Sequence, residues 1–507
     1  MKRTLQTLPK TLDETCERIL LGIPSQYQQE AISALTWLVF GKRPLTIEEL
    51  AEASVIDLTS TTNRPFDANE RLLDPGSILA TLSGLVSVIE ATSVYGKAKI
   101  RLAHFSVEEY LVSDRIKNSP ASAFHLSYTS SARSLSRGCL HYLQCPNLSE
   151  AVLFLGYAAA FPFLAYAAKH WPAHVKDCEG STPSWLLDVL WSFFGSQNSF
   201  RFWEKVQHDS LEYDFKFKDL ENLNWFRRTG SRTSAPDTYM GPFYHACRYG
   251  LADIVQRFLD IDANSGSAAM SGPEKVAGLY ANELHAACYF GQEVVFFKLL
   301  DAGADYAHVG LASTALGATM QSRSPNKQII HRLLELSDRL PTSDSTTGLI
   351  MQLAVHRGDL RTVDLLLEKA DGLDRGFNWT KPSNNNNVML IQSLSSYQSQ
   401  CSAPYEAALR GHFDILQRLI NCWGYVNEAD SEGRTALYWA AFHGHEKVVK
   451  LLLDNGAWAN VVIHSYGWKP IDWAQRRGDL ATVELLRERS LDGPEHHVRL
   501  EQHSEET

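Results

Sequence analysis

Six pairs of residues, each directly before a glycine, carry the most concentrated binding chemistry in this sequence. Their twelve positions hold five arginines, two histidines, four aromatic residues and one leucine, with no acid. Guanidinium groups form paired hydrogen bonds with carboxylates, and aromatic rings stack on apolar and cationic groups. In a chain of net charge −10, such a set suits an acidic or acidic-amphipathic segment of a partner protein. We call these pairs the ladder: Arg248-Tyr249, Tyr289-Phe290, His356-Arg357, Leu409-Arg410, Phe442-His443 and Arg476-Arg477.

Further residues lie where we expect hairpin tips beside the ladder. Arg434, Tyr466 and Trp468 join the partner-binding set, with Ser431 and Glu432 as neighbours. A second interpretation is that arginine and aromatic residues at ladder positions serve contacts inside the molecule. The sequence does not decide between the two interpretations.

No motif in the chain indicates catalysis. The chain has no G-x-S-x-G nucleophile elbow, no H-E-x-x-H zinc pair and no H-R-D kinase loop. His443-Gly-His445 has donor atoms for a metal, as has the adjacent pair His496-His497, but the first lies at a helix junction and the second in a polar tail. Adjacent glutamates such as Glu48-Glu49 lie in the first turns of predicted helices, where carboxylates favour the helix dipole. We therefore expect no enzyme activity, no catalytic residue, no cofactor and no metal site.

The ladder glycines belong to a repeated helical pattern over residues 238–490. Its clearest copy begins at Thr435-Ala-Leu-Tyr-Trp-Ala-Ala, reaches Gly444 and continues through Val-Val-Lys-Leu-Leu-Leu. Small residues let paired helices approach closely, the glycine supplies a left-handed residue that ends the first helix, and the leucine-rich stripe is buried. Glycine spacings of 41, 67, 53, 33 and 34 indicate a period near 33, with a hidden copy near Leu316 and a polar insertion around 384–387. This pattern is that of ankyrin repeats, six readable and one degenerate.

The first 148 residues predict a winged-helix-like domain. Thr11, Thr46 and Ser106 each precede a glutamate by three residues, which marks three helix starts as capping boxes. Two runs rich in strand formers between positions 86 and 105 flank a Gly turn and predict one β-hairpin. Helices, one hairpin and a closing helix together favour a winged helix.

The expected fold is therefore mainly α, with a winged-helix-like domain (1–148), an α-helical connector (149–230) and an ankyrin-repeat solenoid (238–490). Residues 491–507 are polar and predict a disordered tail. The connector is rich in aromatic residues, and this density favours a buried packing layer over a ligand cage. These residues are Trp171, Trp185, Trp191, Phe193, Phe194, Phe202, Trp203 and Trp225.

Length and composition limit the classes of protein to consider. At 507 residues the chain is long enough for several cores, and 44% hydrophobic and 21% charged residues are ordinary for soluble domains. Its eight cysteines form no C-x-x-C pair and its N-terminus lacks the apolar core of a secretory signal. We therefore expect an intracellular protein of the cytoplasm, the nucleus or both. Residues 151–168 contain no charge, but Pro162 interrupts them, so we expect buried helices and no membrane span.

Several segments resemble the winged-helix region of fungal NACHT–ankyrin proteins, which are NLR-like. They are residues 12–20, 43–50, 104–111 and 139–143, while residues 163–174 resemble the helical segment that follows. The resemblance implies the C-terminal part of such a protein and leaves open whether the chain is naturally short or part of a longer gene. Members of that family carry a phosphate-binding loop upstream, whereas this chain has no G-x-x-x-x-G-K-[ST] motif, so no NACHT NTPase domain is implied.

A repeat array offers a long rigid surface without an enclosed pocket, which favours an extended protein partner. We expect a non-enzymatic adaptor that binds an acidic segment of a transcription factor or signalling protein, as a transcription coregulator or signalling scaffold. One alternative is an NLR-like sensor remnant that acts with a separate NTPase. The other is a DNA-binding regulator that uses Lys97, Lys99 and Arg101. Residues 1–150 hold 15 Lys plus Arg and 16 Asp plus Glu, so we expect no direct nucleic-acid binding.

Overall fold

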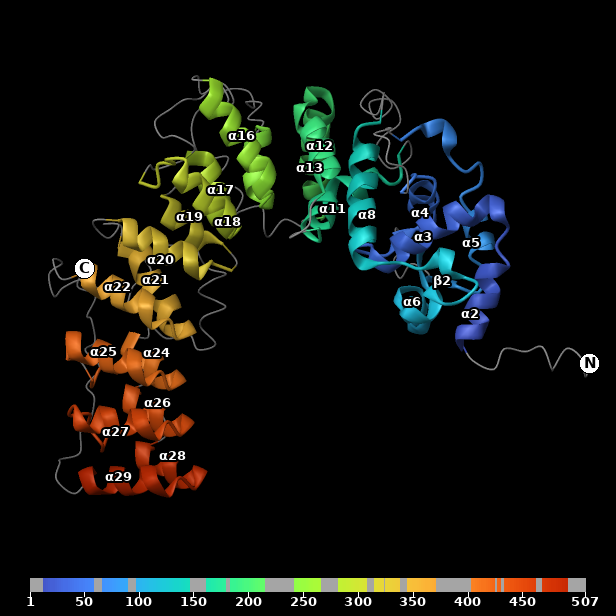
Figure 1. Cartoon of the computed structure of the whole chain (residues 1–507). Helices are drawn as coiled ribbons and strands as arrows, with labels where there is room; N and C mark the ends of the chain where they lie inside the picture. The colour runs from blue at the N-terminus through green and yellow to red at the C-terminus, as the bar shows by residue number, and fades with distance from the viewer. Residues whose placement is uncertain are drawn as a thin grey trace, which may run out of the picture. The chain divides into compact units, whose positions relative to one another are not determined.

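The structure, a computed structural model, divides into two compact units, Met1–Gly272 (the N-terminal unit) and Pro273–Thr507 (the C-terminal unit). Figure 1 labels their helices and strands along the chain. Some parts of the chain for which we made predictions lie outside the described residues: Tyr466, Trp225, the insertion 384–387 and the tail 491–507. The described residues are 12–58, 66–89, 97–145, 161–178, 183–214, 241–265, 281–307, 314–322, 324–337, 344–370, 403–424, 426–429, 433–461 and 467–490.

A small antiparallel sheet surrounded by helices begins the N-terminal unit. β1 (Leu45–Thr46), β2 (Val86–Ile89) and β3 (Lys99–Leu102) pair in the order β1-β3-β2. The sequence predicted the β2–β3 hairpin, whereas β1 is too short to show an alternating pattern. Leu45 and Ile100 lie opposite each other and are buried, so β1 closes the sheet against the helices. These are α2 (Leu12–Leu21), α3 (Gln28–Phe40), α4 (Ile47–Ser54), α5 (Ser77–Thr81) and α6 (Phe105–Val112), with 3-10 turns η1 (Ser25–Tyr27) and η2 (Ala68–Glu70).

The start of α4 is capped as its sequence predicts, and the start of α6 is not. Thr46 Oγ1 accepts a hydrogen bond from Glu49 N (3.3 Å), and Glu49 Oε2 accepts one from Thr46 N (2.9 Å). α6 begins at Phe105 with His104 as its cap, and His104 Nδ1 accepts from the backbone N–H of Ser106 (3.2 Å). The predicted cap at Ser106 is wrong because the histidine ring supplies the acceptor two residues earlier.

The connector helices bury the aromatic layer that the sequence predicts. Trp171, Phe193 and Trp203 are fully buried and meet edge to face, with ring centroids 5.6–5.8 Å apart. Trp185 is an exception, since it is 36% exposed and stacks under the guanidinium of Arg137. No helix among the described residues is long and apolar enough to cross a membrane. The connector helices are α11 (Leu164–Lys176), α12 (Ser184–Gly195) and α13 (Gln197–Asp214), and they follow α7 (Asp114–Lys117), the 3-10 turn η3 (Ser122–Phe124) and α8 (Tyr128–Leu143) of the preceding domain.

The first repeat packs on the connector inside the N-terminal unit. Its helices are α15 (Pro242–Tyr249) and α16 (Ala252–Ser265), and α16 contacts α12. The ring of Phe258 on α16 lies 4.9 Å from that of Trp191. His245 on α15 lies 3.0 Å from Glu204 on α13. The aromatic layer of the connector thus continues into the first repeat.

The described residues of the C-terminal unit form six more helix pairs, of which α19 and α20 lie where the sequence places the degenerate copy. Consecutive first helices pack on one another, as α24, α26 and α28 do, and consecutive second helices form the other layer. The pairs are α17 (Ala281–Tyr289) with α18 (Glu293–Asp301), α19 (Ala315–Gln321) with α20 (Lys327–Leu336), α21 (Asp344–Arg357) with α22 (Leu360–Ala370), α24 (Ala403–Arg410) with α25 (Phe413–Trp423), α26 (Ala436–His443) with α27 (Glu446–Asp454), and α28 (Pro470–Arg477) with α29 (Leu480–Ser490).

Candidate functional site

The ladder residues lie in the last turns of the first helices. The glycine after each pair has a positive φ, from 68° at Gly291 to 77° at Gly250, which confirms the predicted left-handed helix end. At the second pair, Tyr289 is half-buried and the ring of Phe290 is 40% exposed, 4.9 Å from it. Members of the ladder share this location but differ in what they contact.

The first pair belongs to the packing of the N-terminal unit. The ring of Tyr249 lies 5.6 Å from that of Trp171 and 6.2 Å from that of Trp203. Burial raises the pKa of Tyr249, with Arg248 acting in the opposite direction. The guanidinium of Arg248 in turn lies 5.4 Å from the Tyr249 ring. Tyr249 therefore anchors the first repeat to the connector.

Three ladder arginines make polar contacts inside the C-terminal unit. Arg357 donates to the backbone oxygen of Pro325 (2.8 Å), and Arg477 donates to that of Phe442 (3.2 Å). Arg410 pairs with Glu406 of its own helix (2.5 Å). The same carboxylate lies 3.1 Å from Nδ1 of His356, the other member of the third ladder pair. These contacts support the local interpretation for these four side chains.

Two histidines that directly follow ladder glycines connect consecutive repeats. His445 Nε2 donates to the backbone oxygen of Leu409 (3.1 Å), and its ring lies over Gly411, where an added Cβ would be 2.7 Å from Nδ1. His412 covers Gly358 in the same way. His445, the second histidine of His443-Gly-His445, is thus engaged in contacts between consecutive repeats. Among the described residues, no group of three His, Cys, Asp or Glu is arranged to hold a metal ion.

A row of aromatic side chains crosses three consecutive first helices of the C-terminal unit. Tyr405 of α24, Tyr438, Trp439 and Phe442 of α26, and Trp473 of α28 form this row, which we call the aromatic strip. Ring centroids are 5.8 Å apart for Tyr405 and Trp439, and 5.4 Å for Trp439 and Phe442. Phe442 and Trp473 are 4.6 Å apart. These last two rings are half-buried and the other three are buried, so the strip reaches the surface at one edge.

Two arginines stack on indole rings, Arg434 on a buried ring of the strip and Arg476 at its exposed edge. The guanidinium carbon of Arg434 lies 5.3 Å from the ring of Trp439. That of Arg476 lies 5.5 Å from Trp468 and 5.6 Å from Trp473, and these two indoles are 4.6 Å apart. The strip and the stacked arginines bring together part of the predicted partner-binding set and form the candidate site.

Sequence reasoning found Phe442, Arg434, Trp468 and Arg476 but missed the rest of the strip. The available signal was α26 itself, since its sequence ALYWAAFH is apolar on every side. A first helix without a polar face needs cover on its exposed side as well as on its packed side. His443 lies beside the strip, where its ring stacks 5.9 Å from that of Trp439, and burial lowers its pKa.

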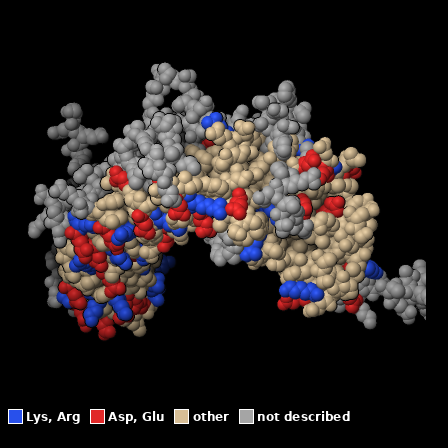
Figure 2. Space-filling view, turned by 45° about the horizontal axis from the view of Figure 1, so that its top comes forward, with Lys and Arg blue, Asp and Glu red and all other residues tan. Residues whose placement is uncertain are grey.

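In the described part of the winged-helix domain, three exposed cations lie on or beside the hairpin, at Lys97, Lys99 and Arg101. Helix α5, which precedes the hairpin, has the sequence SILAT and carries no cation. In the hairpin, Arg101 donates to Ser87 (3.3 Å). On the face that Figure 2 shows, Lys and Arg side chains lie among Asp and Glu over the repeats of the C-terminal unit, without a broad basic patch. A hairpin whose preceding helix carries no cation presents a smaller basic surface than DNA-reading modules usually do, so we do not favour the DNA-binding alternative.

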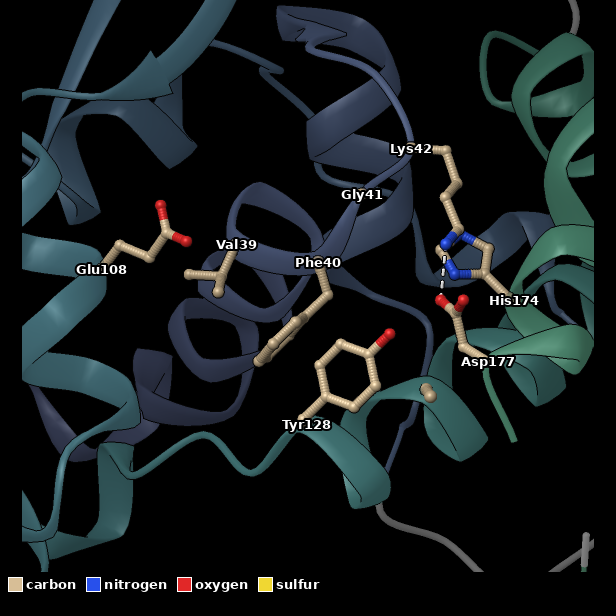
Figure 3. A pocket seen from close by; sticks show the side chains of 9 residues that line it. Val39, Phe40, Gly41, Lys42, Glu108, Tyr128, His174 and Asp177 are labelled. Atoms are coloured by element: carbon tan, nitrogen blue, oxygen red, sulfur yellow. Dashed lines mark hydrogen bonds and ion pairs between the residues drawn. The ribbon is translucent and has the colours of Figure 1, made fainter. Parts of the chain in front are cut away.

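A cavity of about 300 Å³ lies in the N-terminal unit where α3, α6, α8 and α11 meet. Figure 3 shows the rings of Phe40 and Tyr128 together on one side, with Lys42 and Asp177 at the polar end. Lys42 and Asp177 form an ion pair of 2.5 Å across this end. The ion pair leaves the cavity without an unpaired lysine to hold an anionic ligand. We therefore assign the cavity to the packing between the winged helix and the connector and not to a ligand site. The lining residues are Val39, Phe40, Gly41, Lys42, Glu108, Tyr128, Ala132, His174 and Asp177.

Models of two protein families match the chain. Residues 17–127 match the GPI inositol-deacylase winged helix domain, and residues 405–497 match ankyrin repeats in three copies. The chain thus contains an N-terminal winged-helix domain and C-terminal ankyrin repeats. This combination is found in NACHT–ankyrin proteins, so the fold class and the resemblance predicted from the sequence are confirmed.

Curated relatives include fungal ankyrin proteins. The chain is 32% identical over 304 residues to "Azaphilone pigments biosynthesis cluster protein L" of Monascus ruber, covering 59% of this chain and 61% of that protein. It is 24% identical over 214 residues to "Ankyrin repeat domain-containing protein SAT10" of Stachybotrys chartarum, covering 41% of this chain and 9% of that protein. The chain thus matches less than two-thirds of the length of these relatives. The first alignment is longer than the segment from Gly241 to Thr507, so it includes residues before the repeats.

Proposed function

We propose that this protein is a non-catalytic intracellular adaptor whose C-terminal repeats bind an acidic segment of a partner protein. Ankyrin repeats are protein-interaction modules, which supports the general role. The single observation that carries the specific proposal is the aromatic strip with its two stacked arginines, one of them at the exposed edge. Trp, Tyr and Arg dominate the binding energy of protein interfaces, so this edge is the best-equipped part of the described repeats.

The geometry fits an extended segment better than a small molecule. Phe442, Trp468 and Trp473 are half-buried and lie on two consecutive repeats. Apolar side chains of a partner that cover these rings remove further apolar area from water, which is worth about 25 cal/mol per Å². Flanking arginines favour carboxylates beside those side chains. An acidic segment with interspersed apolar residues supplies both.

For the biological role we propose transcription coregulation or signalling within a biosynthetic programme. The Monascus ruber relative is named as a protein of a pigment biosynthesis cluster. A non-catalytic member of such a cluster contributes by regulating or assembling other proteins. Acidic activation segments of transcription factors have the chemistry that the strip favours, so a transcription factor is the partner that we propose.

The test is affinity capture of the full chain from native cells, with cross-linking to map the bound segment. Changing the three ladder arginines Arg357, Arg410 and Arg476 to Glu would also remove contacts inside the repeats. Arg357 donates to a backbone oxygen of the preceding repeat, and Arg410 pairs with an acid of its own helix. We choose the double variant Trp468→Ala with Arg476→Glu. The control is Arg489→Glu on α29, which breaks only the surface ion pair with Asp454.

The double variant should lose the partner and the Arg489→Glu control should retain it, with cross-links to an acidic segment. A partner that still binds the double variant refutes the assignment to the strip. If such a partner binds through residues 1–230 and carries an NTPase domain, the sensor-remnant alternative replaces our proposal.

A further inference from the structure

We propose that Arg476, held by Trp468 and Trp473, is the residue that selects the bound segment, by reading a carboxylate next to a large apolar side chain. This inference rests on the proposed function and adds to it the chemistry that the site selects. It makes one ladder arginine a specificity-determining residue and assigns the other ladder arginines of the C-terminal unit to repeat contacts.

Arg476 differs from those arginines in its contacts. Arg357 and Arg477 donate to backbone oxygens, and Arg410 pairs with Glu406. Arg476 is exposed, and among the described residues its contacts are with the two indole rings. None of the described carboxylates pairs with it, which suits this guanidinium to a carboxylate of a partner.

Stacking prepares this guanidinium for a carboxylate. The group carries five N–H donors, and contacts of its central carbon with two indole rings restrain it without using any of those donors. A side chain already restrained by stacking loses less conformational freedom when it binds. The nearest acid in the same helix, Asp472, accepts a hydrogen bond from the backbone N–H of Lys469 (2.7 Å) and caps the start of α28. The fork of Arg476 therefore fits a bidentate carboxylate of the partner.

The apolar half of the preference comes from the adjoining rings. Trp473, on which Arg476 stacks, is also in edge-to-face contact with Phe442 at 4.6 Å. Both rings are half-buried, so a leucine or phenylalanine beside the carboxylate covers them. Charge alone or apolar area alone uses only part of this surface. The selected pattern is an Asp or Glu adjacent to Leu or Phe.

The experiment measures binding of fluorescein-labelled peptides of about twelve residues to the full chain by anisotropy. The first peptide alternates Glu and Asp with Leu and Phe. In the second, Gln and Asn replace the acids; in the third, Ala replaces the apolar residues; in the fourth, phosphoserine replaces the acids. The protein variants are Arg476→Lys and the matched control Arg477→Lys, an identical change at the next position of the helix.

We expect the first peptide to bind most tightly and Arg476→Lys to weaken it about tenfold, since lysine keeps the charge but not the stacked fork. Arg477→Lys should leave its affinity unchanged. Equal losses in both variants, equal binding of the second or third peptide, or a preference for the phosphopeptide overturn the inference. If the native partner still depends on Trp468 and Arg476 while the first peptide fails to bind, the selectivity is wrong and the adaptor function stands. If the first peptide fails to bind and the native partner does not depend on Trp468 and Arg476, the proposed function itself is refuted.

Discussion

Acidification from about pH 8 to about pH 5 should destabilise the N-terminal unit, because buried neutral histidines hold the winged helix against the connector. His174 is fully buried on α11, next to the buried ring of Trp37 on α3 (5.9 Å between centroids). Its Nε2 lies 3.0 Å from the hydroxyl of Tyr166, which accepts a hydrogen bond from Lys42 N (2.8 Å). Burial, and then the charge of Lys42, lower the pKa of His174 to about 3.

The magnitude follows from linkage. An unfolded histidine titrates near 6.5, so between pH 6.5 and the lowered folded pKa the unfolded state binds more protons. Stability is therefore complete above pH 6.5 and falls as the pH falls. Between pH 6.5 and pH 5, a span of about 1.5 pH units, His174 therefore lowers the free energy of unfolding by about 2 kcal/mol. His141 is also buried and its pKa is lowered to about 4 by burial and by Arg137, so it costs a similar amount. His170 is partly exposed and adds less.

The assay is hydrogen–deuterium exchange of the full chain at several pH values, corrected for intrinsic exchange rates and read at peptides from α8 and α11. The opening free energy there should fall by about 4 kcal/mol between pH 8 and pH 5. In His174→Gln, which does not titrate, the fall should be smaller by about 2 kcal/mol. A flat profile in the wild type, or identical slopes in the two proteins, refutes the reasoning.

Three further substitutions test other contacts. Gly411→Ala should destabilise the C-terminal unit more than Gly456→Ala in urea denaturation followed by circular dichroism. Both glycines have positive φ (74° and 85°), which costs an alanine about 1–2 kcal/mol. Only at Gly411 does the new Cβ lie against His445. Equal losses of stability in the two variants contradict the proposed contact. Glu52→Leu should lower the free energy of unfolding of the N-terminal unit by about 3–5 kcal/mol. Buried Glu52 pairs with Arg71 and accepts hydrogen bonds from Tyr142 Oη (2.7 Å) and Phe163 N (3.1 Å). A loss below about 1 kcal/mol in urea denaturation would count against this network. Tyr249→Ala should raise hydrogen exchange in α15 and leave peptide binding unchanged, and weakened binding would show that the first ladder pair takes part in recognition.

Much of the fold could be predicted from local signals. The repeat glycines mark the residues with positive φ at the ends of first helices, and their spacing indicates the helix pairs, including the copy near Leu316. The two-residue strand β1 could not be predicted, because it is defined by its pairing with Ile100 of β3 and not by a pattern of its own. The cap of α6 was missed because histidine is not among the usual N-cap residues. β1 was thus missed because its partner is distant in sequence, whereas the cap of α6 is local and was missed because of its uncommon residue type.

The candidate site was predicted only in part for a similar reason. Residue type identified cations and aromatic rings, but their availability depends on neighbours in other repeats. Trp439 and Tyr438 read as core residues of one helix, and the structure shows them as members of a row that continues to Trp473. Arg357 and Arg476 look equivalent in sequence. The first donates to a backbone oxygen one repeat away, and the second stacks on two indoles.

Position within the ladder pair separates Arg476 from Arg357, and the first members of the last three pairs share one location. In α28 and α21 the second member, Arg477 or Arg357, reaches an oxygen of the preceding repeat, at Phe442 or Pro325. First members face the aromatic strip instead: Phe442 belongs to it, Leu409 packs against it and Arg476 stacks on Trp473. Adjacent residues of a helix point about 100° apart, so one member of a pair can stabilise the array while the other faces a partner. In the last three repeats, selection for binding should therefore act on the first positions, Leu409, Phe442 and Arg476, and selection for stability on Arg477.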